Sequence, residues 1–445
     1  MSFATGRTGE LMITKSDVVS YAKSLGAGLV GFAPVERWRE KGDLHPNFFP
    51  DSVWPETKTV IVMCVPSLTP VHDTKITRLH RSLYNITNQR LDEMAYMLSV
   101  YLNRNGVPAI YAPRDGYATD GKILKENPTA AFSHVWAGYY AGLGTVGWNH
   151  TLLTRKYGPR HRLVSALSAQ SFEGDPLIED NLCTKCRVCE KACPFESFSS
   201  PQDGVVSNRV SADMNKSRCA HKYEHFEGMP YQHCGFCIKT CPVGEDLRLF
   251  GSPSTREYFE AHHDFEKWTM GVGGNIDVAG KADGLNEERV LVRGVNKAGL
   301  SAKEDTAVSF DAIEKYAQSL GVDIVGFANA SDWGSEVNVP SELYPAAIWP
   351  MARSVIVLAV RAQNGERDAE ARILDEAAYR LAAWLCEQQC PSIHLPSDTG
   401  DEDYIAGASM PLFSHECAAK LAGLDSGGIR AVSVLTTLDL EYRKN

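Results

Sequence analysis

The sequence predicts a mixed α/β (α+β) fold in which helices and strands alternate along the chain, and three observations support this prediction. Two apolar runs, residues 60–65 and 355–360, are far too short to cross a bilayer and predict fully buried strands. An amphipathic segment from about residue 79 to 105 predicts a long helix that stops at Gly106. The chain also repeats part of its own sequence, which predicts two copies of one domain.

The first copy carries further signals for individual elements. Ser16 is expected to cap a helix that ends at Gly26, and residues 28–33 then form a strand. Residues 109–112 predict another strand, and residues 132–142 predict another helix. This alternation is the basis for the mixed class.

The repeat keeps one offset over many positions. Tyr21 recurs as Tyr316 and Trp38 recurs as Trp333, each 295 positions further along the chain. The positions of the first copy that recur at this offset include Tyr21, Ala22, Ser24, Leu25, Gly26, Val30, Gly31, Phe32, Ala33 and Trp38. Chance similarity does not hold one offset for so long, so a duplicated domain is expected. Residues 271–303, with seven glycines and little pattern, are interpreted as the linker before the second copy.

The two copies differ at one loop. In the first copy, the loop contains Gly147-Trp148-Asn149-His150 and Tyr157-Gly158-Pro159-Arg160. In the second copy, Leu424 leads almost directly to a strand near residues 432–435, so 13 residues are missing there. A loop that one copy has lost is not needed to hold the fold, so the retained loop is a candidate for binding.

Eight cysteines between residues 182 and 242 have the spacing of a two-cluster ferredoxin. The first run reads C-x2-C-x2-C-x3-C before Pro194, and the second reads C-x2-C-x3-C before Pro242. The eight residues are Cys183, Cys186, Cys189, Cys193, Cys219, Cys234, Cys237 and Cys241. A [4Fe–4S] cluster takes four thiolates, and in two-cluster ferredoxins the fourth cysteine of each run binds the other cluster.

This rule divides the eight cysteines into two sets. One set is Cys183, Cys186, Cys189 and Cys241. The other set is Cys193, Cys234 and Cys237, with Cys219 as its fourth member. Cys219 is chosen because Tyr231 stands where the second run would otherwise begin with a cysteine. Zinc sites and disulfides are the alternatives, but endings of the x3-Cys-Pro type do not suit zinc sites. The protein is therefore expected to transfer single electrons.

Composition and charge limit the partners and the cellular location that we expect for this protein. The 445 residues carry a net charge of −10 without a basic block, so nucleic acid is not expected as the main partner. Twelve cysteines in a long chain with cluster spacing indicate a reducing compartment. Residues 1–12 have no apolar core and no twin arginine, so no export signal is visible. A cytoplasmic location without membrane attachment is expected.

These motifs together resemble the cobalamin-dependent reductases, the family of reductive dehalogenases and epoxyqueuosine reductase. The resemblance rests on Ala141-Gly142-Leu143-Gly144, Gly147, Asn149, Leu152, Leu153 and Tyr157-Gly158-Pro159-Arg160, followed by the cysteine runs. The short second cysteine run is similar to the dehalogenase branch. The resemblance implies a nitroreductase-like corrinoid-binding domain (1–181), a ferredoxin-like module with two clusters (182–265), a linker (266–307) and a degenerate second copy (308–445).

The resemblance also implies cofactors and a reaction. Electrons from a reduced ferredoxin or flavodoxin-like donor would pass through two [4Fe–4S] clusters to a cobalamin, which cleaves a bond in a small organic substrate. The implied corrinoid-binding residues are Gly142, Gly144, Asn149, Tyr157 and Arg160. The second copy would act as an inactive partner within the monomer, with a homodimer as the alternative.

Two residues are candidates for the catalytic acid, Tyr139 and His134. Tyr139 lies on an apolar helix, where a core role is the alternative. His134 can titrate near neutral pH, but His415 holds the same place in the second copy, which favours a structural role. Pro128 stands near the acidic position of epoxyqueuosine reductases. An enzyme of that type, or a protein that only delivers electrons to a corrinoid, is the alternative function.

Overall fold

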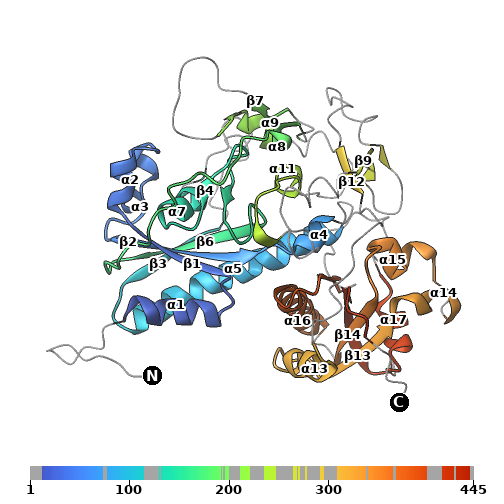
Figure 1. Ribbon diagram of the computed structural model, residues 1–445. Coiled ribbons are helices and arrows are strands. Elements are labelled where there is room, and N and C mark those ends of the chain that lie inside the picture. Colours follow the sequence, from blue (N-terminus) through green and yellow to red (C-terminus); the bar gives the residue numbers. More distant parts are fainter. Residues whose placement is uncertain are drawn as a thin grey trace. The chain divides into compact units, whose positions relative to one another are not determined.

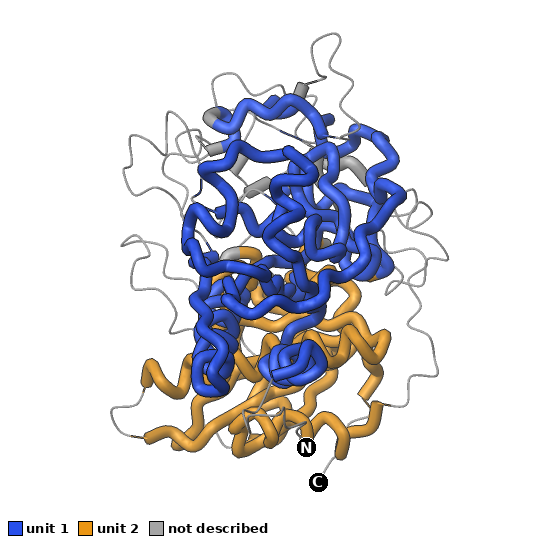
Figure 2. The backbone as a smooth tube through the Cα atoms, turned by 90° about the vertical axis from the view of Figure 1, so that its left-hand side faces the viewer, with its two compact units in different colours: residues 1–67, 87–224, 235–245 blue, residues 68–86, 225–234, 246–445 orange. Residues whose placement is uncertain are grey.

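The computed structural model divides the chain into two compact units, which are coloured separately in Figure 2. Unit 1 comprises residues 1–67, 87–224 and 235–245, and unit 2 comprises residues 68–86, 225–234 and 246–445. The structure describes residues 13–73, 78–114, 130, 132–191, 193, 196–199, 211–220, 235–246, 264–267, 269–270, 276–277, 291–294, 308–336, 339–363, 367–397, 413–424 and 427–440. Both units mix helices and strands, so the predicted mixed α/β class is confirmed.

Unit 1 is built on a four-stranded antiparallel sheet with the strand order β1-β2-β6-β3 (Figure 1). The strands are β1 (Leu29–Pro34), β2 (Thr59–Pro66), β6 (His161–Ser168) and β3 (Ala109–Ala112). In the interior strand β2, Cys64 is paired with Leu29 on one side and with Leu163 on the other. Because β2 is flanked on both sides and covered on both faces, its first seven residues are all buried, as the apolar run predicts.

Helices cover both faces of this sheet (Figure 1). The helices of the two faces are α1 (Lys15–Ser24) and α5 (Arg78–Arg104), of which residues 87–104 belong to unit 1, on one side, and α2 (Glu36–Lys41), α3 (Pro50–Val53) and α7 (His134–Tyr140) on the other. On the α7 side, Trp38 and Tyr140 pack with Val60 and Val62 in one buried cluster. A short 3-10 helix, η1 (Pro46–Phe48), precedes α3.

Two of the predicted element boundaries are corrected by the structure. Ser16 does not cap α1, because Thr14 and Asp17 form a capping box there. The Thr14 side chain accepts from the Asp17 amide (3.2 Å), and the Asp17 carboxylate accepts from the Thr14 amide (3.0 Å). The helix predicted over 132–142 is limited to α7, since Ser133 is its N-cap and Gly142, with a φ of +68°, terminates it.

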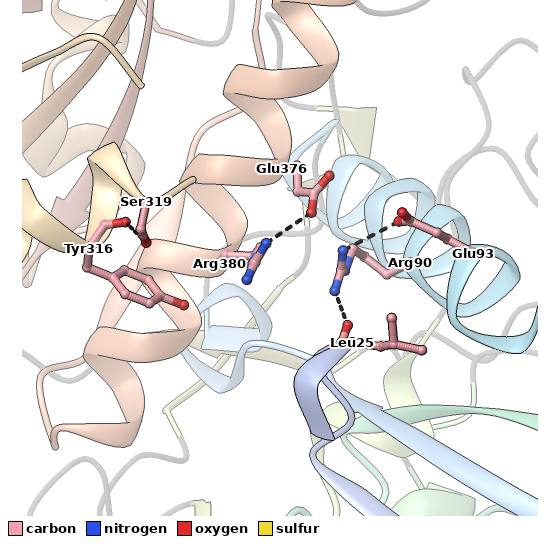
Figure 3. Close-up of polar contacts among 7 residues, drawn as sticks. All are labelled: Leu25, Arg90, Glu93, Tyr316, Ser319, Glu376 and Arg380. Carbon is pink, nitrogen blue, oxygen red and sulfur yellow. Dashed lines mark hydrogen bonds and ion pairs between the residues drawn. The ribbon is translucent and has the colours of Figure 1, made fainter. Parts of the chain in front are cut away.

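Figure 3 shows polar contacts of the two long helices, one in each unit. In unit 1, the Arg90 guanidinium on α5 donates to the carbonyl oxygen of Leu25, the residue that ends α1, and its Nη1 lies 3.5 Å from Glu93 Oε2. In α16 of unit 2 (Arg367–Glu387), Arg380 lies 3.4 Å from Glu376. The bond from Arg90 to Leu25 fixes α5 against the end of α1, whereas the pairs Arg90–Glu93 and Arg380–Glu376 each lie within one helix.

The rest of unit 1 consists of short elements that follow α7. A two-stranded ribbon of β4 (Thr145–Val146) and β5 (Leu152–Leu153) leads into β6. The cysteine region then contains α8 (Val188–Lys191), β7 (Phe198–Ser199), β8 (Asp213–Met214), α9 (Lys216–Ala220) and α11 (Phe236–Lys239). With elements this short, the cysteine region depends on contacts with its surroundings for its shape.

Unit 2 contains a second four-stranded antiparallel sheet, with the strand order β13-β14-β16-β15. Its strands are β13 (Ile324–Asn329), β14 (Ser354–Arg361), β16 (Ile429–Thr436) and β15 (Ser392–His394). Ile324 pairs with Ala359 in this sheet, just as Leu29 pairs with Cys64 in unit 1, at the same offset of 295 residues. The strand order and the register of the two sheets therefore correspond.

Helices and short strands complete unit 2. They are α4 (Thr69–Asp73), β9 (Asp264–Lys267), β10 (Thr269–Met270), β11 (Ile276–Asp277), β12 (Leu291–Gly294), α13 (Phe310–Gln318), η4 (Ala330–Asp332), α14 (Trp333–Glu336), η5 (Ser341–Leu343), α15 (Pro345–Ile348), α16 and α17 (His415–Leu421). β9 pairs with β12 and β10 pairs with β11, where the sequence predicted a linker. The remainder of the predicted linker lies outside the described residues. Across the residues that the structure describes, no helix has the length and apolar character needed to span a bilayer.

Candidate functional site

Four of the predicted cluster ligands line one space in unit 1. Cys183, Cys186, Cys189 and Cys241 all border it, and the space measures about 320 Å³, part of which is open solvent. The other lining residues are Trp148, Asn149, Leu153, Thr184, Arg187, Pro242 and Val243. Cys241 comes from a different segment than the other three, so the fold brings the four thiols together. They are the same four that the spacing rule assigned to one cluster.

The first three of these cysteines belong to one tight loop. Lys185 and Arg187 within it have φ values of +57° and +59°, a left-handed conformation that side chains other than glycine rarely adopt. These two left-handed residues turn the backbone, so that the chain from Cys183 curls around the space as far as α8, which carries Cys189. Such a loop is the element that a C-x2-C-x2-C run requires.

The thiols of this set are electrostatically coupled. Burial, with a smaller contribution from the neighbouring thiols of Cys241, Cys186 and Cys183, raises the pKa of Cys189 to about 12. Burial also raises the pKa of Cys241, to about 11, while Arg160 acts in the opposite direction. The free thiols of Cys189 and Cys241 therefore hold their protons at neutral pH, and metal binding has to displace these protons.

The donor set fits a [4Fe–4S] cluster. Within the described ranges, no three His, Cys, Asp or Glu side chains are grouped to hold a single metal ion. A [4Fe–4S] cluster makes a different demand, because each iron takes one thiolate and the four sulfur atoms surround a cage. Four thiols around one space meet this demand.

The retained loop, residues 144–160, contacts the first cysteine loop; we call it the docking loop. The Trp148 amide donates to Cys183 Sγ (3.4 Å), and the Trp148 indole Nε1 donates to Glu190 Oε2 (2.9 Å). Arg187 donates to both carboxylate oxygens of Glu190 (2.9 and 2.8 Å), and its guanidinium lies 5.4 Å from the Trp148 ring. The indole, the carboxylate and the guanidinium therefore hold the docking loop against α8.

The docking loop also holds the second cysteine segment. Asn149 Nδ2 donates to the carbonyl oxygen of Cys237 (3.1 Å). Arg160, which is only 1% exposed, donates to the carbonyl oxygens of Cys241 (2.9 Å) and Val243 (2.5 Å). Gly158 lies so close to Val243 that a Cβ there would be 1.8 Å from its carbonyl oxygen. The loop therefore sets the position of Cys241.

A third part of the cysteine region is attached through His150. Its Nε2 lies 2.5 Å from the carbonyl oxygen of Ala212, and the Ala212 amide donates to the Trp148 carbonyl oxygen (3.1 Å). Burial lowers the pKa of His150, so the ring is neutral at pH 7 and the nitrogen that faces the carbonyl carries the proton. Residues 148–150 thus contact all three described segments of the cysteine region.

The second predicted set of cysteines is only partly described. Cys193 is buried, and its sulfur accepts from the Ser197 amide (3.5 Å). Cys219 lies on α9 and Cys237 lies on α11. Cys234 lies outside the described residues. A second cluster at these cysteines stays a prediction.

The structure places His134 among structural contacts. Its Nδ1 lies 2.9 Å from Ser165 Oγ and its Nε2 lies 3.0 Å from the Pro113 carbonyl oxygen. Because a carbonyl only accepts, Nε2 carries the proton and Nδ1 accepts from the hydroxyl. His415 makes the equivalent contacts with Ser433 (3.0 Å) and Pro396 (2.8 Å) in unit 2. Both ring nitrogens of His134 are thus engaged in hydrogen bonds, and its catalytic role stays a prediction.

Tyr139, the other candidate acid, lies on α7 and is partly buried. It packs against the buried cluster on the α7 side, with ring centroids 5.7 Å from Trp136 and 5.4 Å from Tyr140. These contacts suit the core role that the sequence left open. Its role as a proton donor stays a prediction.

The residues that the resemblance assigned to a corrinoid are engaged within the protein. A Cβ on Gly142 would lie 2.1 Å from the Pro176 carbonyl oxygen, and a Cβ on Gly144 would lie 2.1 Å from that of Leu153. Tyr157 is 6% exposed, with Lys156 Nζ 4.9 Å from its ring centroid. Asn149 and Arg160 make the backbone contacts described above. Their corrinoid-binding role stays a prediction.

Comparison with known proteins shows that part of the chain is similar in sequence to reductive dehalogenases. The chain matches no protein-family model. It is 26% identical over 216 residues to the tetrachloroethene reductive dehalogenase of Dehalobacter restrictus. The match includes 44% of this chain and 35% of the relative, so the chain spans about a third of that protein's length. The resemblance to this superfamily is thereby confirmed, and the relatives are reductases.

Two solved structures were also similar. An epoxyqueuosine reductase with a tRNA-Tyr stem loop is 18% identical, with a TM-score of 0.34 over 55% of this chain and 74% of that chain. A catabolic reductive dehalogenase in complex with 3-bromo-4-hydroxybenzoic acid is 14% identical, with a TM-score of 0.32 over 99% of this chain and 62% of that chain. With TM-scores this low, neither structure supports a function for this chain.

Sequence reasoning missed the role of the docking loop as a support for the cysteines. It selected Arg160, Asn149 and Tyr157 as cofactor contacts and did not consider Gly158 or Glu190 individually. One signal was available: the copy that lacks the 13 residues is also the copy that lacks the cysteine runs. A loop and a module that are present together and absent together are expected to contact each other.

Proposed function

We propose that the chain is an iron–sulfur and cobalamin-dependent reductase of the dehalogenase-like branch, which cleaves a bond in a small organic substrate. The observation that carries the proposal is the convergence of Cys183, Cys186, Cys189 and Cys241 on one space. These thiols come from two segments and are held there by the docking loop. A fold that gathers four thiols in this way has the donor set of a [4Fe–4S] cluster.

The bound groups would supply one-electron transfer and low-valent cobalt chemistry. In this proposal the four cysteines hold one cluster, and Trp148, Asn149 and Arg160 fix the segments that carry them. A second cluster at Cys193, Cys219, Cys234 and Cys237 completes the electron path. The corrinoid is proposed on the basis of the sequence similarity.

The experiment is anaerobic reconstitution with iron, sulfide and hydroxocobalamin. Two clusters require about eight irons per chain, and a Cys241→Ala variant should lose about four of them. Cys417→Ala is the matched control, because Cys417 lies outside the cysteine runs, on α17. Electron paramagnetic resonance of the reduced protein should show the signal of a [4Fe–4S] cluster, weakened only in the Cys241 variant.

The cobalamin content separates this proposal from its alternatives. Stoichiometric binding of cobalamin in the base-off form, together with reductive turnover of halogenated organic compounds, supports the enzyme. Clusters without bound cobalamin would instead indicate a protein that only transfers electrons. A preparation without iron or acid-labile sulfide would overturn the proposal.

We also propose that residues 308–445 are a second copy of the first domain. The ring stack of Tyr316 on Trp384 (4.9 Å) corresponds to that of Tyr21 on Tyr101 (4.0 Å), and both stacks join the first helix of a copy to its longest helix. Association of separately expressed 308–445 with residues 1–265 in a pull-down is the expected result, with buffer-only resin as the control. Absence of association between the two fragments would contradict the proposed internal pseudo-dimer.

A further inference from the structure

We propose that Arg160 raises the midpoint potential of the cluster bound by Cys183, Cys186, Cys189 and Cys241, by placing a fixed positive charge beside Cys241. This inference rests on the proposed function, since it requires a cluster at these four thiols. It gives Arg160 a role as a positioning and tuning residue for electron transfer. The resemblance instead implied a corrinoid contact for this residue.

The first step of the argument is the location of the charge. The Arg160 side chain is 1% exposed, and its guanidinium donates to the carbonyl oxygens of Cys241 (2.9 Å), Val243 (2.5 Å) and Ile238 (3.4 Å). These acceptors surround the cysteine on both sides in the sequence. The guanidinium is therefore fixed next to a ligand of the cluster and shielded from water, where electrostatic interactions are strongest.

The second step is that the positive charge does not disappear. An arginine guanidinium is not deprotonated in proteins, so its charge persists at every working pH. Arg160 is therefore a fixed cation beside Cys241.

The third step is the charge balance of reduction. A one-electron donor, such as a reduced ferredoxin or dithionite, adds one electron to the iron–sulfur core while the four thiolates stay bound. No bond and no proton is exchanged, so the cluster becomes more negative by one charge. A nearby fixed cation stabilises the reduced state more than the oxidised state, and cluster potentials respond to such neighbouring charge.

The fourth step separates charge from geometry. The fork of the guanidinium binds two carbonyl groups at once, which a lysine ammonium at the same place does less well. Arg160→Lys keeps the charge and loses the fork, whereas Arg160→Gln loses the charge and keeps a side chain that can donate. The pair of variants therefore distinguishes tuning from simple support.

The test is a redox titration of reconstituted protein, followed by electron paramagnetic resonance. For Arg160→Gln, we expect the ratio of reduced to oxidised cluster at a given potential to fall about tenfold, which equals a midpoint shift of about 59 mV for a one-electron couple. Arg160→Lys should shift the midpoint much less. Arg39→Gln, which removes an exposed arginine of α2 in the same unit, should leave it unchanged.

The outcomes are distinguishable from failure of the proposed function. Wild-type protein without a cluster would overturn the proposed function itself. A wild-type cluster with equal midpoints in wild type and Arg160→Gln, or equal shifts in the Gln and Lys variants, would overturn the role of the charge. If Arg160→Gln binds no iron, the Arg160→Lys midpoint decides: a value near that of wild type supports the inference, and a large downward shift overturns it.

Discussion

Gly158 of the docking loop lies against the backbone of Val243, two residues beyond Cys241. A Cβ at Gly158 would lie 1.8 Å from the Val243 carbonyl oxygen, and the φ of Gly158 is +53°. No side chain fits at this point, so only glycine lets the docking loop and the second cysteine segment meet. The position of one thiol of the cluster set thus depends on a residue that carries no functional group.

We therefore predict that Gly158→Ala displaces the segment carrying Cys241 and lowers the iron content by about one cluster, or four irons. Gly42→Ala is the control, since Gly42 has a similar φ of +63° but nothing within 4 Å of its added Cβ. Both variants incur the left-handed strain of about 1–2 kcal/mol. Iron analysis after reconstitution should separate them, and equal iron contents would contradict the contact.

The indole of Trp148 links the docking loop to the first cysteine loop through Glu190. Trp148→Phe removes the donor of the 2.9 Å hydrogen bond while keeping an aromatic ring under Arg187. We expect a loss of about 1–2 kcal/mol in the stability of the contact, because a hydrogen bond to a charged group is removed. The measurement is the rate at which a chelator extracts iron, which should rise about tenfold. Trp54→Phe, in the same unit but outside this contact, should leave the rate near that of wild type.

His134 and His415 make matching pairs of hydrogen bonds, and this predicts matching effects on stability. Replacing either residue with alanine should lower the free energy of unfolding by about 1–3 kcal/mol, since a buried serine hydroxyl and a proline carbonyl oxygen lose their hydrogen bonds. Urea denaturation measures this change. If His134 were instead the catalytic acid, His134→Asn would abolish the alkaline limb of the pH–rate profile while His415→Asn would not.

Because His394 on β15 is buried, we predict that the stability of unit 2 depends on pH. The residue is fully buried, its Nε2 lies 3.3 Å from Ser82 Oγ, and burial lowers its pKa from 6.5 to about 4. The unfolded chain therefore binds a proton more readily than the folded one between these values. Stability is full above about pH 6.5 and falls as the pH decreases toward 4, by up to about 1.4 kcal/mol per pH unit.

The measurement is urea denaturation at pH 7 and pH 5 for wild type and His394→Gln. We expect the variant to lose part of the difference between the two pH values, because glutamine does not titrate in this range. His45→Gln is the control, since His45 is exposed. An identical pH difference in wild type and His394→Gln would contradict the prediction.

The sequence determined the periodic elements and the ligand set of the candidate cluster. The apolar run at 60–65 became the interior strand β2, and the strand predicted over 109–112 has those bounds in the structure. These elements depend on local pattern, which the sequence carries directly. C-x2-C spacing is likewise a local pattern, and the two-cluster ferredoxin rule, in which the fourth cysteine of each run binds the other cluster, predicted the grouping of Cys183 with Cys241.

Only the tertiary structure decided what surrounds those thiols. Arg160 and Asn149 have polar groups that suit a ligand as well as a backbone carbonyl, and nothing in their spacing separates the two. Their partners, Cys241 and Cys237, lie some eighty residues away in the chain and approach only after the sheet and the cysteine region have packed. Such contacts depend on long-range packing rather than on local periodicity, so the contacts of the docking loop with the cysteine region are defined only in the folded chain.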